Sequence, residues 1–243
     1  MGKKIRVQRR GRGAPTFKAS THKRVAPTHY VSLTKTNNEA VKAVIEDLVH
    51  ESGRGSPLAK IRFKNTVFFN VAAEGISKGQ EIQLGTAAPI GIGNILPVGK
   101  IPSGTMVCNI ELSPGDGGKL VKSSGTYATI VAHTPEGTLV KLPSGKSTYF
   151  KNSCRATIGI VAGAGRTDKP FLKAGKKLAW LRSKGRLYPI TSGIAMNAVD
   201  HPHGGGRHKS TSLKPTTVSR TAPPGQKVGM IASRQTGRRK RRK

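Results

Sequence analysis

The sequence has very few acidic residues. Its 243 residues include 11 Asp and Glu against 43 Lys and Arg, which gives a formal net charge of +32. A chain with so much positive charge repels itself and binds polyanions, so its charge favours RNA, DNA or an anionic membrane as a partner.

Long apolar runs are also absent. The sequence contains no run of about 18 apolar residues, which is what a membrane-spanning helix needs. The N-terminal MGKKIRVQRRGRG is basic but lacks the apolar segment of a secretory signal. We therefore expect a soluble, cytoplasmic protein that has no membrane partner.

Cysteine is scarce, and the two cysteines, Cys108 and Cys154, are far apart in the sequence. They form no C-x-x-C pair, which excludes a zinc ribbon and a dithiol redox motif. We expect both to be small buried side chains.

The positive charge is concentrated toward the two ends. Residues 1–38 carry 10 basic groups, residues 201–243 carry 12, and neither segment contains an acid. Segments of this composition bury too little apolar surface to offset their conformational entropy. They indicate a basic N-terminal extension over 1–38 and a basic C-terminal extension over 166–243, each ordering along a phosphate backbone. A solvated tail or a localisation signal is the alternative interpretation.

The central part is typical of a β protein, because its glycines and prolines separate short apolar runs. We predict two small barrels, one over 39–88 and one over 89–165. In 59–64, Ile61 and Phe63 face one way and the basic residues the other. The run 106–112 predicts a strand with Met106, Cys108, Ile110 and Leu112 on one face. The expected strands are 40–47 (which a helix would also fit), 59–64, 66–71, 81–85, 106–112, 127–134, 138–142, 147–150 and 156–161.

After about residue 166 the pattern changes. Residues 173–186 favour a short basic helix whose apolar side is formed by Leu178, Trp180 and Leu181. We expect Trp180 to lie in the core.

Residues 195–210, AMNAVDHPHGGGRHKS, combine three histidines, one aspartate and three consecutive glycines. A metal site would use His201, His203, His208 and Asp200, but His-x-His lacks the helical i,i+4 spacing of the zinc proteases. A hydrolase would need a nucleophile, and no G-x-S-x-G motif is present.

A third interpretation is a loop that lies against an anion, because each residue type in this segment could then contribute to binding. Glycines let the backbone approach a ligand closely, and their N–H groups can point at phosphate oxygens. Arg207 and Lys209 add charge, and imidazole rings can stack on bases or bond to 2′-hydroxyls. The sequence therefore favours a loop inserted into folded RNA.

Several collinear blocks make the chain resemble the universal large-subunit ribosomal protein two family, in its archaeal and eukaryotic branch. The block PITSGIAMNAVDHPHGGG (189–206) is similar to the family signature. Residues 94–132, the segment LPSGKSTYFKNSCRATIGIV, the end TAPPGQKVGMIASRQTGRRKRR and the start MGKKIRVQRRGRG are similar to further parts of it.

The resemblance implies a mainly β fold, an OB-fold barrel followed by an SH3-like barrel, with long basic extensions that enter ribosomal RNA. It also implies a non-enzymatic role in binding large-subunit rRNA, in subunit association, in tRNA placement and in organising the peptidyl-transferase centre. His201 is the position that the family associates with peptidyl transfer. Ser192 and Ala198 depart from the arginine and proline that the family usually has.

The implied partners are large-subunit rRNA and other ribosomal proteins, with tRNA and the small subunit as indirect partners. One copy per ribosome is expected, and no cofactor beyond Mg²⁺ ions that bridge to rRNA. A basic DNA- or chromatin-binding protein is the alternative, although no helix-turn-helix, zinc finger or basic zipper is visible. The candidate RNA-binding residues are Arg6, Arg9, Arg10, Arg12, Lys18, Lys23, Arg24, Asn197, His201, His203, Gly204, Gly205, Gly206, Arg207, Lys209, Arg220, Arg234, Arg238 and Arg239.

Overall fold

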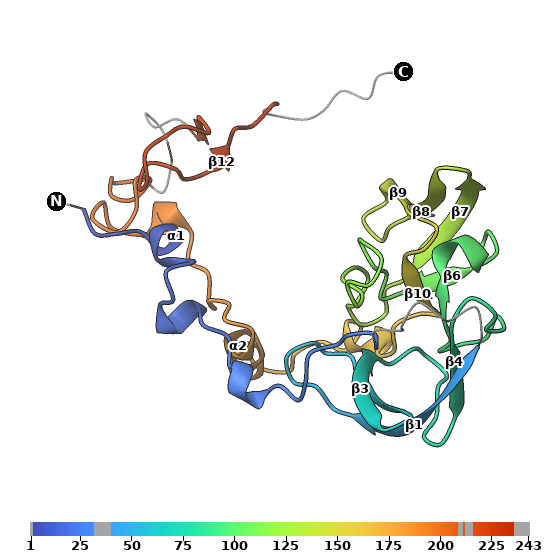
Figure 1. The fold of residues 1–243 in the computed structure, drawn as a ribbon. Coiled ribbons are helices and arrows are strands. Elements are labelled where there is room, and N and C mark those ends of the chain that lie inside the picture. Colours follow the sequence, from blue (N-terminus) through green and yellow to red (C-terminus); the bar gives the residue numbers. More distant parts are fainter. Residues whose placement is uncertain (1, 32–39, 209–210, 212–215, 236–243) are drawn as a thin grey trace. The chain divides into compact units, whose positions relative to one another are not determined.

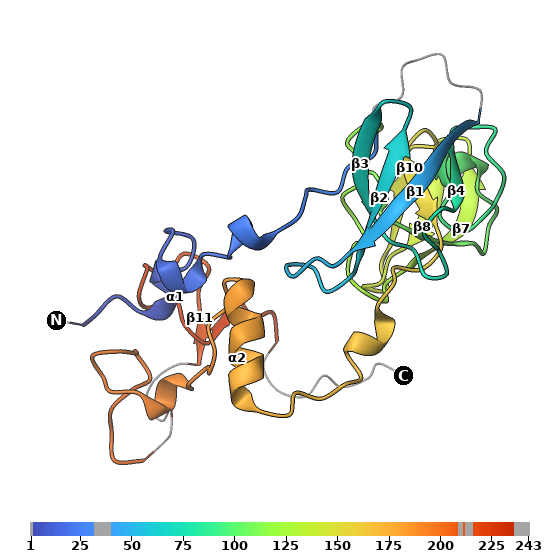
Figure 2. The ribbon, with the colours of Figure 1, turned by 90° about the horizontal axis from the view of Figure 1, so that it is seen from below.

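The computed structural model describes residues 2–31, 40–208, 211 and 216–235. The chain forms two compact units. Residues 21–170 make up the first, which we call the barrel unit. Residues 1–20 and 171–243 make up the second, the terminal unit (Figures 1 and 2).

The barrel unit is built around ten strands joined in one sheet, in the order β3-β2-β1-β4-β5-β10-β6-β7-β8-β9. The fold is therefore mainly β, as predicted, and the two successive strand groups are consistent with an OB-fold barrel and an SH3-like barrel. The strands are β1 (Val41–Val49), β2 (Leu58–Phe63), β3 (Thr66–Val71), β4 (Glu81–Leu84), β5 (Ile95–Pro97), β6 (Met106–Cys108), β7 (Ala128–Thr134), β8 (Gly137–Lys141), β9 (Ser147–Phe150) and β10 (Arg155–Ile158).

The first barrel comprises β1 to β4. The segment that a helix would also have fitted is strand β1, which pairs with β2 on one side and β4 on the other. Its alternate residues Ala43 and Ile45 are buried, which is the period of two expected of a half-buried strand. In β2, Ile61 is buried and Arg62 is exposed, so the facing predicted for this strand is confirmed.

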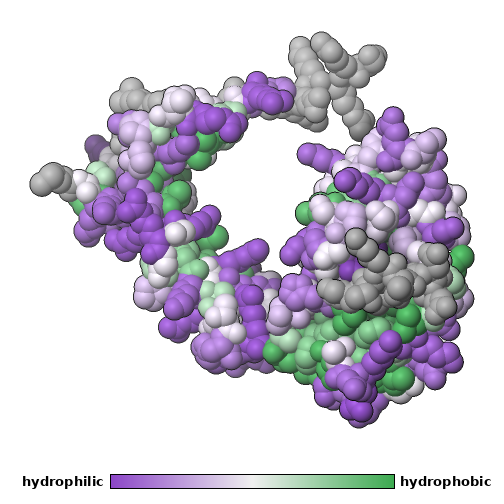
Figure 3. Space-filling model, viewed as in Figure 1, coloured by the Kyte–Doolittle hydropathy of each residue, from purple (hydrophilic) through white to green (hydrophobic). Residues whose placement is uncertain are grey.

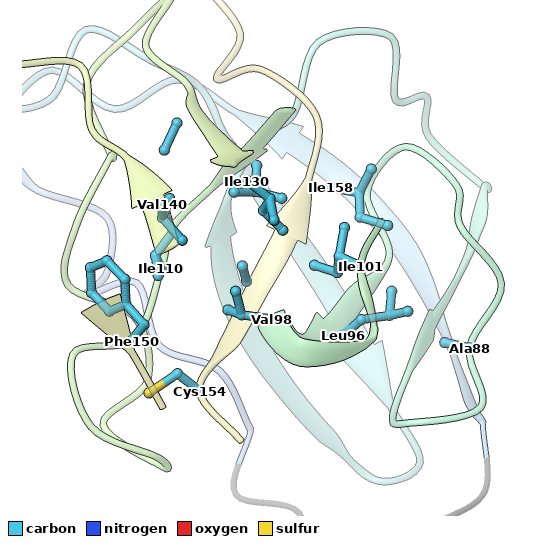
Figure 4. Packing of buried hydrophobic residues seen from close by; sticks show 13 residues of the cluster. Ala88, Leu96, Val98, Ile101, Ile110, Ile130, Val140, Phe150, Cys154 and Ile158 are labelled. Carbon is cyan, nitrogen blue, oxygen red and sulfur yellow. The ribbon is translucent and has the colours of Figure 1, made fainter. Parts of the chain in front are cut away.

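The second barrel contains β5 to β10 and has its own apolar core. Figure 4 shows Ile130, Val140, Phe150 and Ile158 converging from different strands toward Val98 and Ile101. Cys108 and Cys154 are both free and buried, as predicted. Burial raises the pKa of the Cys108 thiol to about 12, so this thiol stays protonated at neutral pH.

The chain beyond β10 connects the two barrels in a way the sequence did not predict. Strand β10 pairs with β5 and β6 in the second barrel. Three residues after β10 ends, Val161 pairs with the end of the first barrel through a bridge to Ala73. The N–H of Glu74 donates to Ile160 O at 2.7 Å, and the N–H of Ala162 donates to Ala72 O at 2.9 Å.

A buried polar network lies where the two barrels meet. The Tyr30 hydroxyl donates to Asn109 O at 2.5 Å and lies 2.7 Å from Thr157 Oγ1. Asn70 donates through Nδ2 to Thr157 Oγ1 at 3.1 Å and accepts a hydrogen bond from Asn109 Nδ2 at 2.6 Å. Because each of these side chains comes from a different part of the barrel unit, the network fixes these parts against one another.

The network continues into a buried ion pair between Glu111 and Arg155. Glu111 Oε1 accepts from Arg155 Nη2 at 2.7 Å, and Glu111 Oε2 accepts from the Arg155 backbone N–H at 2.8 Å. Backbone N–H groups of Gly115 and Gly117 also donate to this carboxylate. The Arg155 guanidinium lies over the Tyr30 ring, 5.2 Å from its centroid, and donates to Val31 O.

The alternation predicted for residues 106–112 is wrong. Met106 and Leu112 are exposed, and the five consecutive residues from Val107 to Glu111 are all buried. The strand ends after Cys108, because Asn109 has a φ of 48°, in the left-handed region that interrupts a strand. The segment then runs through the junction of the two barrels, where both of its faces are covered.

The terminal unit contains little regular structure and almost no core. Among its described residues, only Ile5 and Val228 are buried hydrophobic side chains. The two ends of the chain nevertheless pack together, which the prediction of separate extensions did not foresee. The unit contains α1 (Arg6–Arg9), α2 (Ala174–Ser183), the parallel pair β11 (Thr217–Val218) and β12 (Met230–Ile231), and short 3₁₀ helices at Pro15–Phe17 and Gly193–Ala195.

The prediction of a short basic helix near residues 173–186 is confirmed by α2, but the prediction that Trp180 lies in the core is wrong. No residue of α2 is buried. Trp180 is half-exposed; its ring lies 5.5 Å from that of Phe171, and Lys184 Nζ lies 4.1 Å from its centroid. The terminal unit has too few apolar side chains to enclose an indole. Among the described residues, no helix is long and apolar enough to cross a membrane.

We predict that Glu111→Ala destabilises the barrel unit by about 3–5 kcal/mol, because it leaves the Arg155 guanidinium buried without its partner. Glu81→Ala is the control, since it removes an exposed pair with Lys42 and should cost about 0–1 kcal/mol. Urea unfolding of both variants measures the difference, and equal midpoints would contradict the role assigned to Glu111.

Candidate nucleic-acid interface

The positive charge is concentrated in the terminal unit. Residues 1–20 and 171–243 together carry 25 Lys and Arg and a single acid, Asp200. Asp200 forms an exposed ion pair with Lys3, 3.6 Å from Nζ. Hydrophilic residues cover most of the visible surface of the terminal unit, with smaller apolar areas between them (Figure 3). A unit with so much charge and so little core is suited to a polyanionic surface.

The histidine-rich segment is a closed loop held by its own backbone. Asn197 O accepts from the N–H groups of Asp200 and His201, at 3.0 and 3.2 Å. Gly205 N donates to Met196 O at 3.0 Å, which joins the two ends of the loop. Gly204 is buried, and a Cβ there would collide with the carbonyl oxygens of Met196 and Asn197. Glycine at this position is therefore required by the close approach of two backbone segments.

The imidazole of His201 packs directly against Gly193. A Cβ added at Gly193 would overlap with this ring. The His203 backbone N–H donates to His201 Nδ1 at 3.0 Å. This contact makes Nδ1 an acceptor, so in the neutral ring the proton is on Nε2. The rings of His201 and His203 meet edge to face with centroids 5.1 Å apart.

The metal and hydrolase interpretations of the loop each require a particular arrangement of side chains. Among the residues that the structure describes, no group of three His, Cys, Asp or Glu side chains is placed to hold a metal ion. In a Ser-His-Asp triad the aspartate accepts a hydrogen bond from Nδ1–H of the histidine. Here Nδ1 of His201 accepts a backbone N–H, and Asp200 pairs with Lys3.

The N-terminal segment packs against this loop. Lys3 N donates to Val199 O at 2.9 Å, and Ile5 is buried. A cavity of about 290 Å³ lies between residues 2–8, residues 198–202 and residues 224–225. This contact could not be predicted from the sequence, because hydrogen bonds between backbone groups leave no pattern in side-chain types.

An aromatic and cationic surface formed by α2 and the residues on either side of it was not predicted. It consists of Phe171, Trp180, Lys184, Tyr188 and Lys177, whose Nζ lies 5.2 Å from the Tyr188 ring centroid. The i,i+4 spacing of Trp180 and Lys184 on a helix would have indicated it. Such partly exposed rings are platforms on which nucleic-acid bases can stack.

The predicted RNA-binding residues fall into three groups. Lys23 and Arg24 belong to the barrel unit, and Lys209, Arg238 and Arg239 lie outside the described residues. The remaining cations are all exposed in the terminal unit, where the structure also places the loop residues Asn197, His201, His203, Gly204, Gly205 and Gly206. These cations are Arg6, Arg9, Arg10, Arg12, Lys18, Arg207, Arg220 and Arg234.

Comparison with known proteins identifies the family. The family described as "Ribosomal Proteins L2, C-terminal domain" matches residues 91–222, a span that includes the second barrel, α2 and the histidine loop. The chain is 49% identical over 243 residues to "Large ribosomal subunit protein uL2" of Korarchaeum cryptofilum, covering 100% of this chain and 98% of that protein. The chain belongs to the ribosomal protein L2 family.

Two other relatives in the family agree with this assignment. The protein of the same name from Hyperthermus butylicus is 53% identical over 242 residues, covering 99% of this chain and 100% of the relative. The one from Methanococcus maripaludis is 50% identical over 241 residues, covering 98% and 100%. These alignments extend over the sequence of both structural units.

We predict that Gly204→Ala opens the histidine loop, because the added methyl group displaces the carbonyls of Met196 and Asn197. A local cost of about 1.4 kcal/mol accelerates amide hydrogen exchange about tenfold at Gly204 and Gly205. Gly175→Ala is the matched control, since a Cβ there contacts nothing within 4 Å. Unchanged exchange in Gly204→Ala would show that the loop does not depend on this close approach.

Proposed function

We propose that this protein is a structural component of the large ribosomal subunit and binds large-subunit rRNA, mainly through its terminal unit. The observation that carries the proposal is the separation of charge from core. The sequence of the terminal unit has 25 cations and one acid, and its described residues include only two buried hydrophobic side chains. Self-repulsion in such a unit is relieved by a polyanion that surrounds it.

The names of the relatives support this proposal, since each is called a large ribosomal subunit protein and aligns over at least 98% of this chain. The setting we propose is the cytoplasmic ribosome, with one copy of the chain beside other ribosomal proteins. The chain would contribute structure and no catalysis.

The histidine loop suggests a finer role. We propose that it organises rRNA near the peptidyl-transferase centre, with His201 acting through the RNA. The ring of His201 packs on Gly193 and its Nδ1 is already bonded, which suits a positioning group better than an acid or base. Through that RNA, the protein would support tRNA placement and subunit association, with Mg²⁺ bridging loop and phosphate where needed.

A basic DNA- or chromatin-binding protein would have a similar positive charge, so the charge alone does not distinguish it from an RNA-binding protein. It would also need an element that reads a regular groove, usually a helix with side chains that reach base edges. Trp180 on the helix α2 lies beside Phe171 and has Lys184 over its ring, which suits unstacked bases in folded RNA. This difference favours RNA.

We predict that binding to large-subunit rRNA falls steeply with salt. If the terminal unit makes about 6–10 phosphate contacts, affinity drops about 10³–10⁵-fold between roughly 50 and 200 mM salt. Filter binding over this range measures the slope, and a flat response would contradict the proposal.

The same question is tested in the cell by sedimentation of a lysate through sucrose gradients in moderate and then high salt. Co-migration with the large subunit after the high-salt wash is expected of a protein embedded in RNA. Release to the top of the gradient, or migration with DNA, would reject the proposed function.

We predict that His201→Ala leaves the barrel unit folded and allows assembly, but slows peptide-bond formation by the purified subunits. The reason is that removal of the ring uncovers Gly193 and frees the loop to move. His22→Ala is the control, because His22 is exposed in the barrel unit. Equal rates for wild type, His22→Ala and His201→Ala would remove the role proposed for His201.

A further inference from the structure

The loop between β4 and β5, residues 85–93, exposes two large apolar side chains on the barrel unit. Ile90 is 58% exposed and Ile92 is 52% exposed. Single exposed apolar residues are common at protein surfaces and need no explanation. Here the two isoleucines are separated by one glycine, and Ala87 and Pro89 on the same loop are exposed as well. The loop therefore presents an apolar projection to its surroundings.

The buried side chain of Asn94 holds the backbone of this loop. Its Nδ2 donates to Pro89 O at 2.9 Å, and its Oδ1 accepts from Gln83 N at 2.9 Å. The backbone N–H of Asn94 donates to Gly91 O at 3.1 Å. Because these bonds fix the loop before any partner is present, less conformational entropy is lost when the two isoleucines are bound.

The chain around this loop is poor in positive charge. Residues 79–99 contain no Lys, Arg or His, although 43 of the 243 residues of the chain are Lys or Arg. Two lysines near β4 are paired with acids. Lys42 Nζ lies 3.2 Å from Glu81 Oε2, and Lys78 Nζ lies 3.6 Å from Asp47 Oδ1. A segment of this composition does not suit RNA, because binding to a phosphate backbone depends on Lys and Arg.

An exposed carboxylate, that of Glu74, belongs to the segment beside the loop. Glu74 precedes Gly75, where an added Cβ would lie 3.9 Å from Ile92 Cδ1. The Glu74 backbone N–H donates to Ile160 O at 2.7 Å, which fixes this segment to the chain beyond β10. Within the described part of the chain, the Glu74 carboxylate forms no ion pair. It is therefore available to a cation on a partner.

We propose that the loop 85–93, together with Glu74, docks a protein partner that presents apolar side chains and a Lys or Arg. The isoleucines would enter an apolar hollow of the partner, and the partner's cation would pair with Glu74. A second copy of this chain fits less well, because a two-fold contact through this loop brings the same acid toward itself. That the partner is another protein of the large subunit rests on the proposed function, whereas the surface itself does not.

The first experiment places a photoreactive residue on the loop. Ile90 is replaced by p-benzoylphenylalanine in the full chain, the variant is expressed in living cells, and the crosslinked species is identified by mass spectrometry. The same replacement at Asn65, in the exposed turn between β2 and β3, is the control. We expect position 90 to crosslink a protein segment that contains apolar residues and Lys or Arg, and position 65 not to crosslink that segment.

Crosslinking of position 90 to rRNA, to a second copy of the chain, to an acidic segment or to nothing would overturn the proposal. Sedimentation of the same lysate separates this result from the proposed function. If the chain does not sediment with the large subunit, the proposed function fails, but a crosslink to a basic apolar segment still supports the docking surface. If the chain does sediment there and position 90 crosslinks only rRNA, the docking surface fails and the proposed function stands.

The second experiment measures the affinity of the crosslinked segment, made as a synthetic peptide, for the purified full chain. Fluorescence anisotropy at about 150 mM salt is suitable, because the Debye length of about 8 Å then screens distant cations. Ile90→Ser combined with Ile92→Ser should raise the Kd about tenfold or more, since it removes the apolar anchor. Val67→Ser combined with Val131→Ser, at exposed positions elsewhere on the barrel unit, should leave the Kd unchanged. Circular dichroism establishes that each variant keeps its β structure.

The role of the carboxylate is tested by Glu74→Lys, which places a like charge opposite the partner's cation and should also raise the Kd about tenfold. Glu136→Lys, in the exposed turn between β7 and β8, changes the net charge equally and should have no effect. Ile90→Ser alone is a further variant, because removal of a side chain that is more than half exposed leaves the core intact. If neither Ile90→Ser nor Glu74→Lys differs from the controls, the docking surface is rejected.

Discussion

The buried polar junction between the two barrels is the interaction on which the barrel unit depends. Tyr30 enters it from the N-terminal side and bonds to Asn109 and Thr157. Glu111 and Arg155 form an ion pair, and Arg155 also donates to Val31 O and lies over the Tyr30 ring. Burial raises the pKa of the Tyr30 hydroxyl well above its usual value, which keeps it a hydrogen-bond donor. Since an unpaired buried polar group is costly, these bonds favour the observed placement of the strands at the junction.

The terminal unit follows a different physical rule. Apolar burial cannot stabilise it, because its described part buries only two hydrophobic side chains. It is held by backbone contacts such as Lys3 with Val199 and Gly205 with Met196, which bring the two ends of the chain together. A polyanionic partner would offset the electrostatic repulsion between so many cations. The two units therefore differ in kind: the barrel unit has an apolar core of its own, and the terminal unit is the part that we propose binds RNA.

Much of the fold could be predicted from residue patterns. The strands of the first barrel are marked by apolar residues at a period of two, as in β2, and glycine and proline mark the turns between them. The errors fall where tertiary contacts override the local pattern. Residues 107–111 are buried on both faces because they run between the barrels, and Trp180 stays half-exposed because the terminal unit cannot enclose it. Neither fact is encoded in the spacing of apolar residues.

By itself the sequence determined the mainly β fold, the basic ends, the histidine loop as a candidate contact and the family, because composition, periodicity and collinear motifs are properties of the chain. Only the tertiary structure decided that residues 160–162 pair with the first barrel and that His201 lies on Gly193. It also placed Arg24 and Arg166 against Gly53 and Gly55 in the turn between β1 and β2. The physical reason is that these are contacts between residues far apart in sequence, set by packing and backbone hydrogen bonds that leave no local pattern.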